Sequence, residues 1–197
     1  MATLNFLTGN AGKLAEAETL LSPLGWNIQS FEIDGEIPDV IEPQSDNLTN
    51  VALAKIAQGV ELLASQNRLE ESLLVEDSGL FIDALPEFPG VYSAQVLQSL
   101  GCDGILRLLD ENRSAHFLTV AALWTGKAVE VFVGRCDGEI SMECRGDGGF
   151  GYDPIFIPNE NEDGRTFAEM THEEKSACSH RGRALRALYD YLNENGA

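Results

Sequence analysis

Two different periods of apolar positions divide the start of the chain into a strand and a helix. Residues 3–10, TLNFLTGN, begin as an apolar strand and end in small polar residues. Residues 11–22 then place apolar side chains on one face of a helix, namely Leu14, Ala17, Leu20 and Leu21. Asn10 is predicted to be the N-cap of this helix, because its side-chain oxygen can accept from the unpaired N–H groups of the first turn.

The same two periods of apolar positions predict the remaining strands and helices of the chain. Strands are predicted at residues 26–34 and 72–83, and helices at 47–64, 104–112 and 171–193. The strand at 72–83 is expected to turn abruptly at Ser78–Gly79, and residues 86–92, PEFPGVY, are expected to form a turn-rich loop. Residues 115–138 are predicted to form two strands around a turn at Gly126–Lys127, which is a hairpin signal.

The order of these elements predicts the fold class. Strands and helices alternate early in the chain, and an antiparallel pair follows. This order favours an α/β fold in which a mixed sheet is flanked by helices. Neither an internal repeat nor a linker interrupts the sequence, so residues 1–197 are expected to form a single domain.

Charge limits the partners of this chain. It carries 32 acidic and 13 basic residues, a formal net charge of -19, and 44% of its residues are apolar. The apolar residues suffice for a core, whereas the charge repels polyanions, so neither nucleic acid nor an anionic membrane is expected as a partner. No apolar run reaches the roughly 20 residues of a membrane span, and the N-terminus lacks a secretory pattern. A cytoplasmic location is therefore expected.

Cysteine and histidine positions give no metal pattern. The cysteines, Cys102, Cys136, Cys144 and Cys178, have no C-x-x-C spacing, and the three histidines give no zinc signature. We expect the cysteines to be reduced and structural. A site for an anionic ligand would therefore gather a few lysines and arginines or recruit a metal ion.

Residues 7–14, LTGNAGKL, match half of a phosphate-binding loop. Gly12 and Lys13 fit the pattern G-x-x-x-x-G-K-[ST], but leucines stand at the first glycine and at the hydroxyl position. A strand that ends in Thr8-Gly9-Asn10 and leads into a helix still offers backbone N–H groups to an anion. Lys13 can reach the same anion. The alternative is a capped helix with an exposed lysine.

Two adjacent carboxylates, Glu76 and Asp77, follow an apolar run and precede a Ser-Gly step. Desolvation and mutual repulsion would destabilise this pair unless a cation offsets them. Magnesium suits the place, because it favours one or two carboxylates together with phosphate oxygens. Successive strand residues face opposite sides, so one of the two is expected to point into a site. The alternative is a strand that ends in solvent.

Two later segments offer groups for a flat polar ligand. In residues 146–156, GDGGFGYDPIF, the rings of Phe150 and Tyr152 alternate with glycines and can face a base, and Asp153 can accept from ring N–H groups. Residues 173–185 gather cationic donors: Lys175, His180 and Arg181. The alternatives are a glycine-rich turn with core aromatics and a charged helix surface. Taken with the carboxylates and the phosphate-facing backbone, these groups describe a nucleoside triphosphate site.

The motifs resemble, in order, those of the inosine triphosphate pyrophosphatases of the Ham1 type. The matching stretches run from Thr8 to Leu185: TGNAGK, VEDSGL, PGVYSA, GGFGYDPIF, TFAEMTHEEKS and SHRGRAL. The resemblance implies an elongated mixed sheet with two lobes around a central cleft, and usually a homodimer. It also implies magnesium-dependent hydrolysis of ITP, dITP and XTP to the monophosphate and pyrophosphate, which removes these purine nucleotides from the pool.

The resemblance implies roles for single residues on the phosphate side. The triphosphate would be held by the motif residues Thr8, Gly9, Asn10 and Lys13. Lys55, in NVALAKI, matches a family lysine near the phosphates. Asp77 would be the catalytic carboxylate, a magnesium ligand and the base for water, with Ser78 beside it.

On the base side, the resemblance implies that the purine stacks on Phe150. The pocket around the ring would be shaped by Gly151, Tyr152 and Asp153, and the base edge would be read by Lys175, His180 and Arg181. Donors from these cations suit the O6 acceptor of hypoxanthine and xanthine, and they would be left unpaired against the amino group of adenine. An unmet buried donor costs roughly 1–3 kcal/mol.

The chain departs from the family pattern at two places. Gln95 stands where arginine often follows YSA, so a phosphate or interface role of that arginine is not carried over. A second metal carboxylate is expected before the long helix, where this chain has IPDVIEPQ. Asp39 fits it by motif and Glu42 by residue type, with Asp39 preferred. Whether Glu76 binds metal or only supports Asp77 stays open.

The sequence pattern leaves two rival functions. A Maf-type pyrophosphatase shares the expected fold but prefers modified pyrimidine nucleotides, and the pair FGYDPIF and SHR argues against it. A nucleotide-binding sensor without turnover would have little need for a carboxylate at the phosphates, so Asp77 with both lysines argues against that function.

Overall fold

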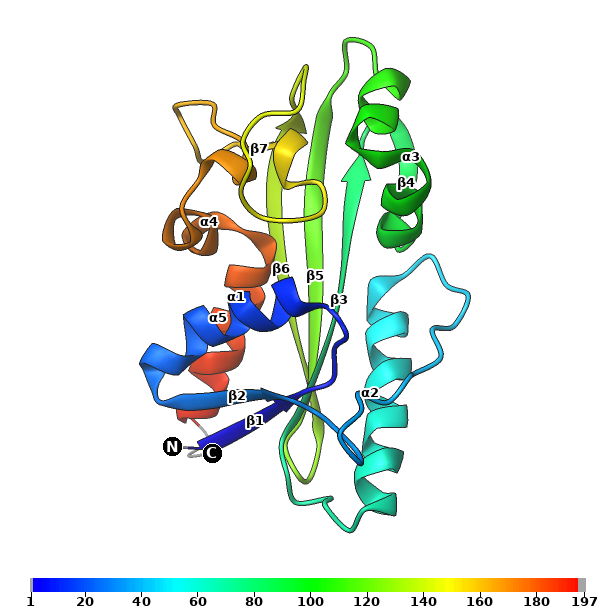
Figure 1. The fold of residues 1–197 in the computed structure, drawn as a ribbon, viewed down its shortest axis with the longest axis vertical. Coiled ribbons are helices and arrows are strands. Elements are labelled where there is room, and N and C mark those ends of the chain that lie inside the picture. Colours follow the sequence, from blue (N-terminus) through cyan, green and yellow to red (C-terminus); the bar gives the residue numbers. More distant parts are fainter. Residues whose placement is uncertain (1, 195–197) are drawn as a thin grey trace. The chain divides into compact units, whose positions relative to one another are not determined.

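A computed structural model describes residues 2–194 (Figure 1). Its strands are β1 Ala2–Phe6, β2 Trp26–Ser30, β3 Leu73–Ile82, β4 Leu85–Gly90, β5 Ser114–Trp124, β6 Val129–Ile140 and β7 Phe156–Pro158. They form a sheet in the order β2-β1-β3-β5-β6-β7, with β4 paired to β3. β1 is parallel to β2 and β3, whereas β3–β4 and β6–β7 are antiparallel. The mixed sheet expected from the order of elements is confirmed.

The helices that accompany the sheet are α1 Ala11–Leu21, α2 Leu48–Ser65, α3 Ser93–Leu108, α4 His172–Cys178 and α5 His180–Glu194, with short 3-10 turns at Ser22–Leu24, Asp153–Ile155 and Phe167–Glu169. The N-cap predicted for α1 is confirmed, because the Asn10 side chain accepts from the Lys13 N–H. Asn47 caps α2 in the same way. Within residues 2–194, none of the helices combines the length and the apolar character that a membrane span needs.

The described chain divides into two compact units. Unit 1 contains residues up to Asp77 together with 120–133 and the segment from Ala184 onward, and unit 2 contains 78–119 and 134–183. The core of unit 1 joins β1, α1 and α5 through buried apolar side chains such as Leu4, Phe6, Leu21 and Leu188. α2 approaches β3 closely at Gly59, where a Cβ atom would collide with the Leu73 side chain.

Unit 2 is built on an aromatic core. The rings of Phe117, Phe156 and Phe167 lie within 6.1 Å of one another, centroid to centroid. Leu80 and Ile82 of β3 and Ile140 of β6 complete this core. Because aromatic pairs contribute beyond their buried area, the cluster gives unit 2 a rigid base for its loops.

The turn predicted at Ser78–Gly79 is wrong, because β3 continues to Ile82. Gly79 is needed for close approach rather than for a turn: a Cβ atom there would overlap the carbonyl group of Gly90. The loop predicted at residues 86–92 is likewise wrong over most of its length, since β4 occupies Leu85–Gly90 and pairs with β3. Proline is tolerated in such a strand where its missing N–H is not needed for pairing.

Two helix predictions also need correction. The helix predicted at residues 104–112 begins earlier, at Ser93, and is interrupted at Gly101, whose φ of 66° and ψ of -179° are not helical. The helix predicted at residues 171–193 is divided into α4 and α5 at Ser179, which is extended with φ -70° and ψ 156°. The Ser179 hydroxyl accepts from the Gly182 N–H at 3.1 Å, as an N-cap serine does, and this bond starts α5.

The hairpin predicted around Gly126–Lys127 is confirmed. β5 ends at Trp124, β6 begins at Val129, and the Thr125 N–H donates to the Ala128 carbonyl at 3.0 Å across the turn. Gly126 has φ 87°, in the region that favours glycine.

Candidate functional site

In unit 1, one lysine side chain meets two carboxylates. Lys55 of α2 places its Nζ 2.9 Å from Glu42 Oε1 and 3.4 Å from Asp77 Oδ1. The Lys55 and Asp77 side chains are only 12% and 13% exposed, whereas Glu42 is 47% exposed. The spacing of apolar residues in α2 explains this arrangement, because Lys55 stands one helical turn after the buried Val51 and thus on the buried face of the helix, where it contacts Asp77 of β3.

Burial and charge oppose each other at these groups. Burial raises the pKa of the Asp77 carboxyl, and the ammonium groups of Lys55 and Lys13 offset only part of that rise. Burial alone would lower the pKa of the Lys55 ammonium, but Asp77 and Glu42 outweigh it, so that this pKa lies above its ordinary value. Lys55 therefore stays charged, and Asp77 binds a proton more readily than an exposed aspartate does.

A second lysine of unit 1, Lys13, contacts the other carboxylate of β3, that of Glu76. Lys13 Nζ donates to the Glu76 carbonyl at 3.3 Å and lies 3.5 Å from Glu76 Oε1. The Glu76 side chain is fully buried, and that of Lys13 is 15% exposed. Because Glu76 and Asp77 are successive strand residues, their side chains leave opposite faces of the strand. Each carboxylate thus has its own lysine.

The segment before α1 supplies backbone and hydroxyl groups. Asn10 N–H donates to Thr8 Oγ1 at 3.1 Å, and the Asn10 side chain caps the helix through the Lys13 N–H. Thr8 is half-buried, while Gly9 and Asn10 are exposed at the helix N-terminus. We call Thr8, Gly9, Asn10, Lys13, Glu42, Lys55, Glu76 and Asp77 the lysine–carboxylate group.

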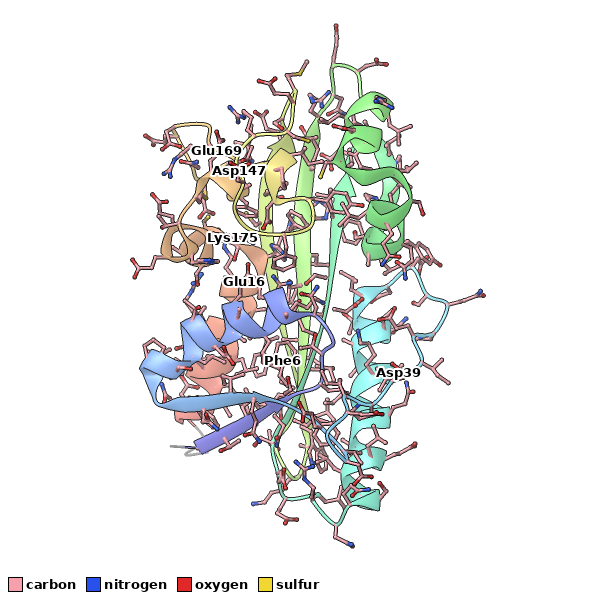
Figure 2. All side chains as sticks on the ribbon, viewed as in Figure 1. Phe6, Glu16, Asp39, Asp147, Glu169 and Lys175 are labelled. Carbon is pink, nitrogen blue, oxygen red and sulfur yellow. The ribbon has the colours of Figure 1, made fainter. Side chains whose placement is uncertain are left out.

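The two candidates for a second metal carboxylate occupy different places. Glu42 contacts Lys55, whereas Asp39 is exposed in the segment that precedes α2 (Figure 2). Within residues 2–194, histidines, cysteines and carboxylates form no cluster of three that could hold a metal ion. The oxygen donors at Lys55 are two carboxylates, and they suit a hard cation that takes its remaining ligands from phosphate and water.

In unit 2, an aromatic ring lies against two cations. Lys175 Nζ is 4.8 Å from the centroid of the Phe150 ring, and the guanidinium carbon of Arg181 is 5.4 Å from it. Lys175 is labelled on α4 in Figure 2. It also donates to Asp153 Oδ2 at 2.6 Å, and both side chains are 5% exposed. Asp153 Oδ2 accepts in addition from the Phe150 N–H at 2.7 Å. We call Phe150, Asp153, Lys175 and Arg181 the aromatic–cation group.

Backbone conformation in the glycine-rich loop, residues 144–153, explains how the Phe150 ring is positioned. Gly149 and Gly151 flank the ring with φ values of 69° and 71°, which L side chains rarely adopt. A Cβ atom at position 149 would also overlap the Asp153 carboxylate. The glycines therefore let the loop fold back on Asp153 and set Phe150 against the cations.

Arg181 extends the group toward β3. Its Nη2 donates to Ser78 Oγ at 3.2 Å, and Ser78 Oγ lies 2.7 Å from the hydroxyl of Thr119. Arg181 is only 3% exposed. The sequence indicated Ser78 and Arg181 but not Thr119. The available signal for Thr119 was its place as a polar residue at an inward position of the apolar strand FLTVAAL, residues 117–123.

Two other predicted site residues are core residues of unit 2. The His180 ring stacks on Phe117 with centroids 4.4 Å apart and an interplanar angle of 9°, and His180 is 4% exposed. Tyr152 is buried, and its hydroxyl donates to the Ser93 carbonyl at 2.9 Å. Burial raises the pKa of the Tyr152 hydroxyl. Both residues support the loop and the helix that carry Phe150 and Arg181.

The structure thus collects the predicted residues into two chemical groups. The first offers ammonium groups, a helix N-terminus and a buried carboxylate, which together suit phosphate oxygens and a cation. The second offers a ring face with fixed cationic donors, which suits a flat base with acceptor oxygens. An α/β protein with both groups has the donor set of a nucleotide-handling enzyme.

Comparisons with known proteins agree with that class. The model of the Ham1 family matches residues 4–191, and the chain belongs to this family. It is 48% identical to a dITP/XTP pyrophosphatase of Thermococcus kodakarensis, over 98% of each chain, and 42% identical to one of Pyrococcus horikoshii, over 96% of each. A HAM1 protein structure from Coxiella burnetii aligns with a TM-score of 0.81 at 33% identity and covers 98% of this chain and 100% of its own.

Proposed function

We propose that this protein is a pyrophosphatase of non-standard purine nucleotides, which converts dITP, XTP and ITP to the monophosphate and pyrophosphate. The observation that carries the proposal is the buried Asp77 carboxylate beside the Lys55 ammonium, at the head of a group that suits a triphosphate. Relatives that are 48% and 42% identical bear the name dITP/XTP pyrophosphatase, which supports the same activity here.

The triphosphate is proposed to lie on the lysine–carboxylate group. The N–H groups at the start of α1 form the positive end of the helix dipole, which favours an anion such as a phosphate group. The hydroxyl of Thr8 lies beside these N–H groups. Lys13 and Lys55 neutralise phosphate charge that the strongly acidic chain would otherwise repel. This local gathering of two of the 13 basic residues is what an anionic substrate requires of such a chain.

Magnesium is the proposed cofactor, held by Asp77 and Glu42 together with phosphate oxygens. The two carboxylates suit a magnesium ion because their oxygens lie close enough to contact the same cation, the Lys55 ammonium. We assign the second carboxylate to Glu42 rather than Asp39 for this reason. When bound, the ion supplies charge neutralisation to the phosphates and acidifies water.

Asp77 is proposed to act as the base in the reaction. Water attacks the α-phosphorus, its proton passes to an Asp77 carboxylate oxygen, and the bond to the pyrophosphate oxygen breaks. Lys13 and Lys55 stabilise the charge that develops on the departing pyrophosphate.

The base of the nucleotide is proposed to stack on Phe150. Arg181 and Lys175 lie against that ring and present N–H donors, which suit the O6 acceptor of hypoxanthine or xanthine. Adenine places an amino group at the same position, so these donors would remain unpaired. His180, which stacks on Phe117, is proposed to hold the start of α5 and thereby Arg181. Gly151, Tyr152 and Asp153 shape the loop.

One further expectation is part of the proposal. A homodimer is implied by the resemblance to the family, and light scattering coupled to size-exclusion chromatography would measure the oligomeric state. A monomer at micromolar concentration would remove the homodimer from the proposal without touching the activity.

Pyrophosphate release tests the activity directly. With magnesium present, we expect the protein to release pyrophosphate, and not single phosphates, from XTP, dITP and ITP. ATP should react at least roughly 30-fold more slowly, because two or more unpaired buried donors each cost about 1–3 kcal/mol. Removal of magnesium with EDTA should abolish turnover.

Three results would contradict the proposal in different ways. Equal hydrolysis of XTP and ATP would remove the role of Arg181 and Lys175 in base selection. Preference for modified pyrimidine triphosphates would indicate a Maf-type activity instead. Tight XTP binding without pyrophosphate release would indicate a nucleotide sensor.

The buried Glu76 gives a second prediction. Glu76→Gln keeps the side-chain volume but removes the charge that holds Lys13, so we expect KM for XTP to rise about tenfold, the loss of one charge-assisted bond. kcat should change less than KM. Steady-state kinetics of Glu76→Gln, Lys13→Met and the double variant measure whether the two effects overlap.

The control is Glu18→Gln, which removes an exposed charge from the same helix, α1. It should leave KM unchanged. Fully additive effects of Glu76→Gln and Lys13→Met would show that Glu76 does not act through Lys13.

A further inference from the structure

One glutamine of α2 binds the backbone of the segment that precedes this helix. Residues 37–47 form neither helix nor strand and lie beside α2 (Figure 1). The Gln58 side chain accepts from the Ile41 N–H at 2.8 Å and donates to the Ile41 carbonyl at 2.8 Å. One side-chain amide thus pairs with both backbone groups of Ile41, as a residue of a neighbouring antiparallel strand would.

The partners of Gln58 fix the orientation of its amide group. Its Nε2 also donates to the Ala54 carbonyl, one helical turn earlier, at 3.0 Å. The amide nitrogen therefore meets two carbonyl oxygens, and the amide oxygen meets the Ile41 N–H. A rotated amide would place its oxygen against both carbonyls and its nitrogen against the N–H, so the contacts define a single orientation.

Hydrophobic burial does not explain why Ile41 lies at this place. The Ile41 side chain is 79% exposed, and residues 42–44 are exposed as well. Among the described residues, Gln58 and Lys55 are the two side chains that form hydrogen bonds with residues 38–44. Because they stand three residues apart in α2, they share one face of the helix. The segment is therefore held by polar contacts with that face.

We propose that Gln58 is a positioning residue, which holds Ile41 against α2 and thereby places the Glu42 carboxylate at the proposed magnesium site. Glu42 directly follows Ile41, and Pro43 disfavours a helical backbone at Glu42, so few conformations separate the two residues. The Glu42 carboxylate then lies 2.9 Å from Lys55 Nζ. This inference rests on the proposed function, in which Glu42 is a metal ligand.

Glu42 needs this support because its own contacts restrain it weakly. Its side chain is 47% exposed, and an ion pair of such exposure contributes little to the position of a loop. Lys55 also contacts Asp77 at 3.4 Å, so it is shared between two carboxylates. Without Gln58, the segment should spend more time away from α2, and the apparent affinity for magnesium should fall with the fraction of molecules in which Glu42 is in place.

Amide hydrogen exchange tests the contact without magnesium and without turnover. In metal-free protein, the Ile41 N–H should exchange about tenfold faster in Gln58→Met than in the wild type, as NMR would measure. Methionine keeps the length of the side chain but lacks the amide. The control Gln44→Met makes the same change at an exposed glutamine of the same segment and should leave the exchange rate unchanged. Equal exchange in Gln58→Met and the wild type would overturn the contact.

Magnesium titration tests the role of the contact. In Gln58→Met, the magnesium concentration for half-maximal pyrophosphate release from XTP should rise about threefold to tenfold, and kcat at saturating magnesium should stay close to wild type. When Glu42→Gln is already present, Gln58→Met should raise this concentration no further, because the carboxylate that Gln58 positions is lost. Gln44→Met should require the same magnesium concentration as the wild type.

The contrary outcomes can be told apart. Faster exchange in Gln58→Met with an unchanged magnesium requirement would limit Gln58 to a structural contact and overturn its role at the metal site. Fully additive effects of Gln58→Met and Glu42→Gln would overturn that role as well, since Gln58 would not act through Glu42. Absence of pyrophosphate release in the wild type would instead contradict the proposed function, and the exchange rates would still decide whether Gln58 holds the segment.

Discussion

Asp77→Asn is expected to lower kcat for XTP hydrolysis about 100- to 10,000-fold, the range for loss of a positioned base. The amide cannot take up the proton of the attacking water at neutral pH, although its size and position match the carboxylate. The fold should survive, because Lys55 retains Glu42 at 2.9 Å and the β3 backbone is unchanged. Stopped pyrophosphate assays at saturating XTP and magnesium measure kcat, and thermal melting monitors the fold.

A matched comparison resolves the metal carboxylates. Glu42→Gln should raise the magnesium concentration that gives half-maximal rate, because Glu42 contacts the same ammonium as Asp77. Asp39→Asn removes an exposed charge from the same segment and should leave this concentration unchanged. The reverse result would transfer the second carboxylate to Asp39. A kcat for Asp77→Asn close to wild type would exclude Asp77 as the base.

Lys175→Met is expected to lower the free energy of unfolding by about 3–5 kcal/mol, because it leaves the Asp153 carboxylate buried without the ammonium that lies 2.6 Å away. Methionine fills nearly the same volume, so the loss is one of charge rather than of packing. Urea unfolding, followed by circular dichroism, measures it. The variant should also lose selectivity for XTP over ATP, since Lys175 lies against the Phe150 ring.

Two variants separate charge from structure in this experiment. The double variant Lys175→Met/Asp153→Asn removes both charges and should regain part of the lost stability, because a neutral pair is less costly to bury. Lys127→Met changes an exposed lysine in the β5–β6 turn and should leave unfolding unchanged. If Lys175→Met is as stable as Lys127→Met, the buried pair does not hold the glycine-rich loop.

Local signals predicted part of the fold because their causes are local. Asn10 and Asn47 each precede a helix and cap it through their own side chains, which requires no distant partner. The turn at Gly126–Lys127 follows from a glycine flanked by two apolar strands. The mixed sheet follows from the order of strands and helices along the chain.

The errors in β3 and β4 occurred where a distant contact outweighed a local signal, whereas the error in the last helix arose from two competing local signals. Ser78-Gly79 suggested a turn, yet the strand continues because position 79 must lie against the Gly90 carbonyl, and residues 85–90 become a strand through the same pairing. The division of the last helix at Ser179 was visible in principle, since serine is a preferred N-cap, but apolar spacing alone favoured one helix.

The sequence by itself determined the residue types of the candidate site and their order along the chain: the TGNAGK turn, the Glu76-Asp77 pair, the glycines around Phe150 and the cations of residues 175–181. Tertiary structure decided how these residues are paired. Lys13 forms an ion pair with Glu76, and Lys55 forms ion pairs with Asp77 and Glu42. Lys175 forms an ion pair with Asp153. The physical reason is that ion pairs and burial depend on distances of a few ångströms between residues far apart in the chain, and periodicity carries no information about them.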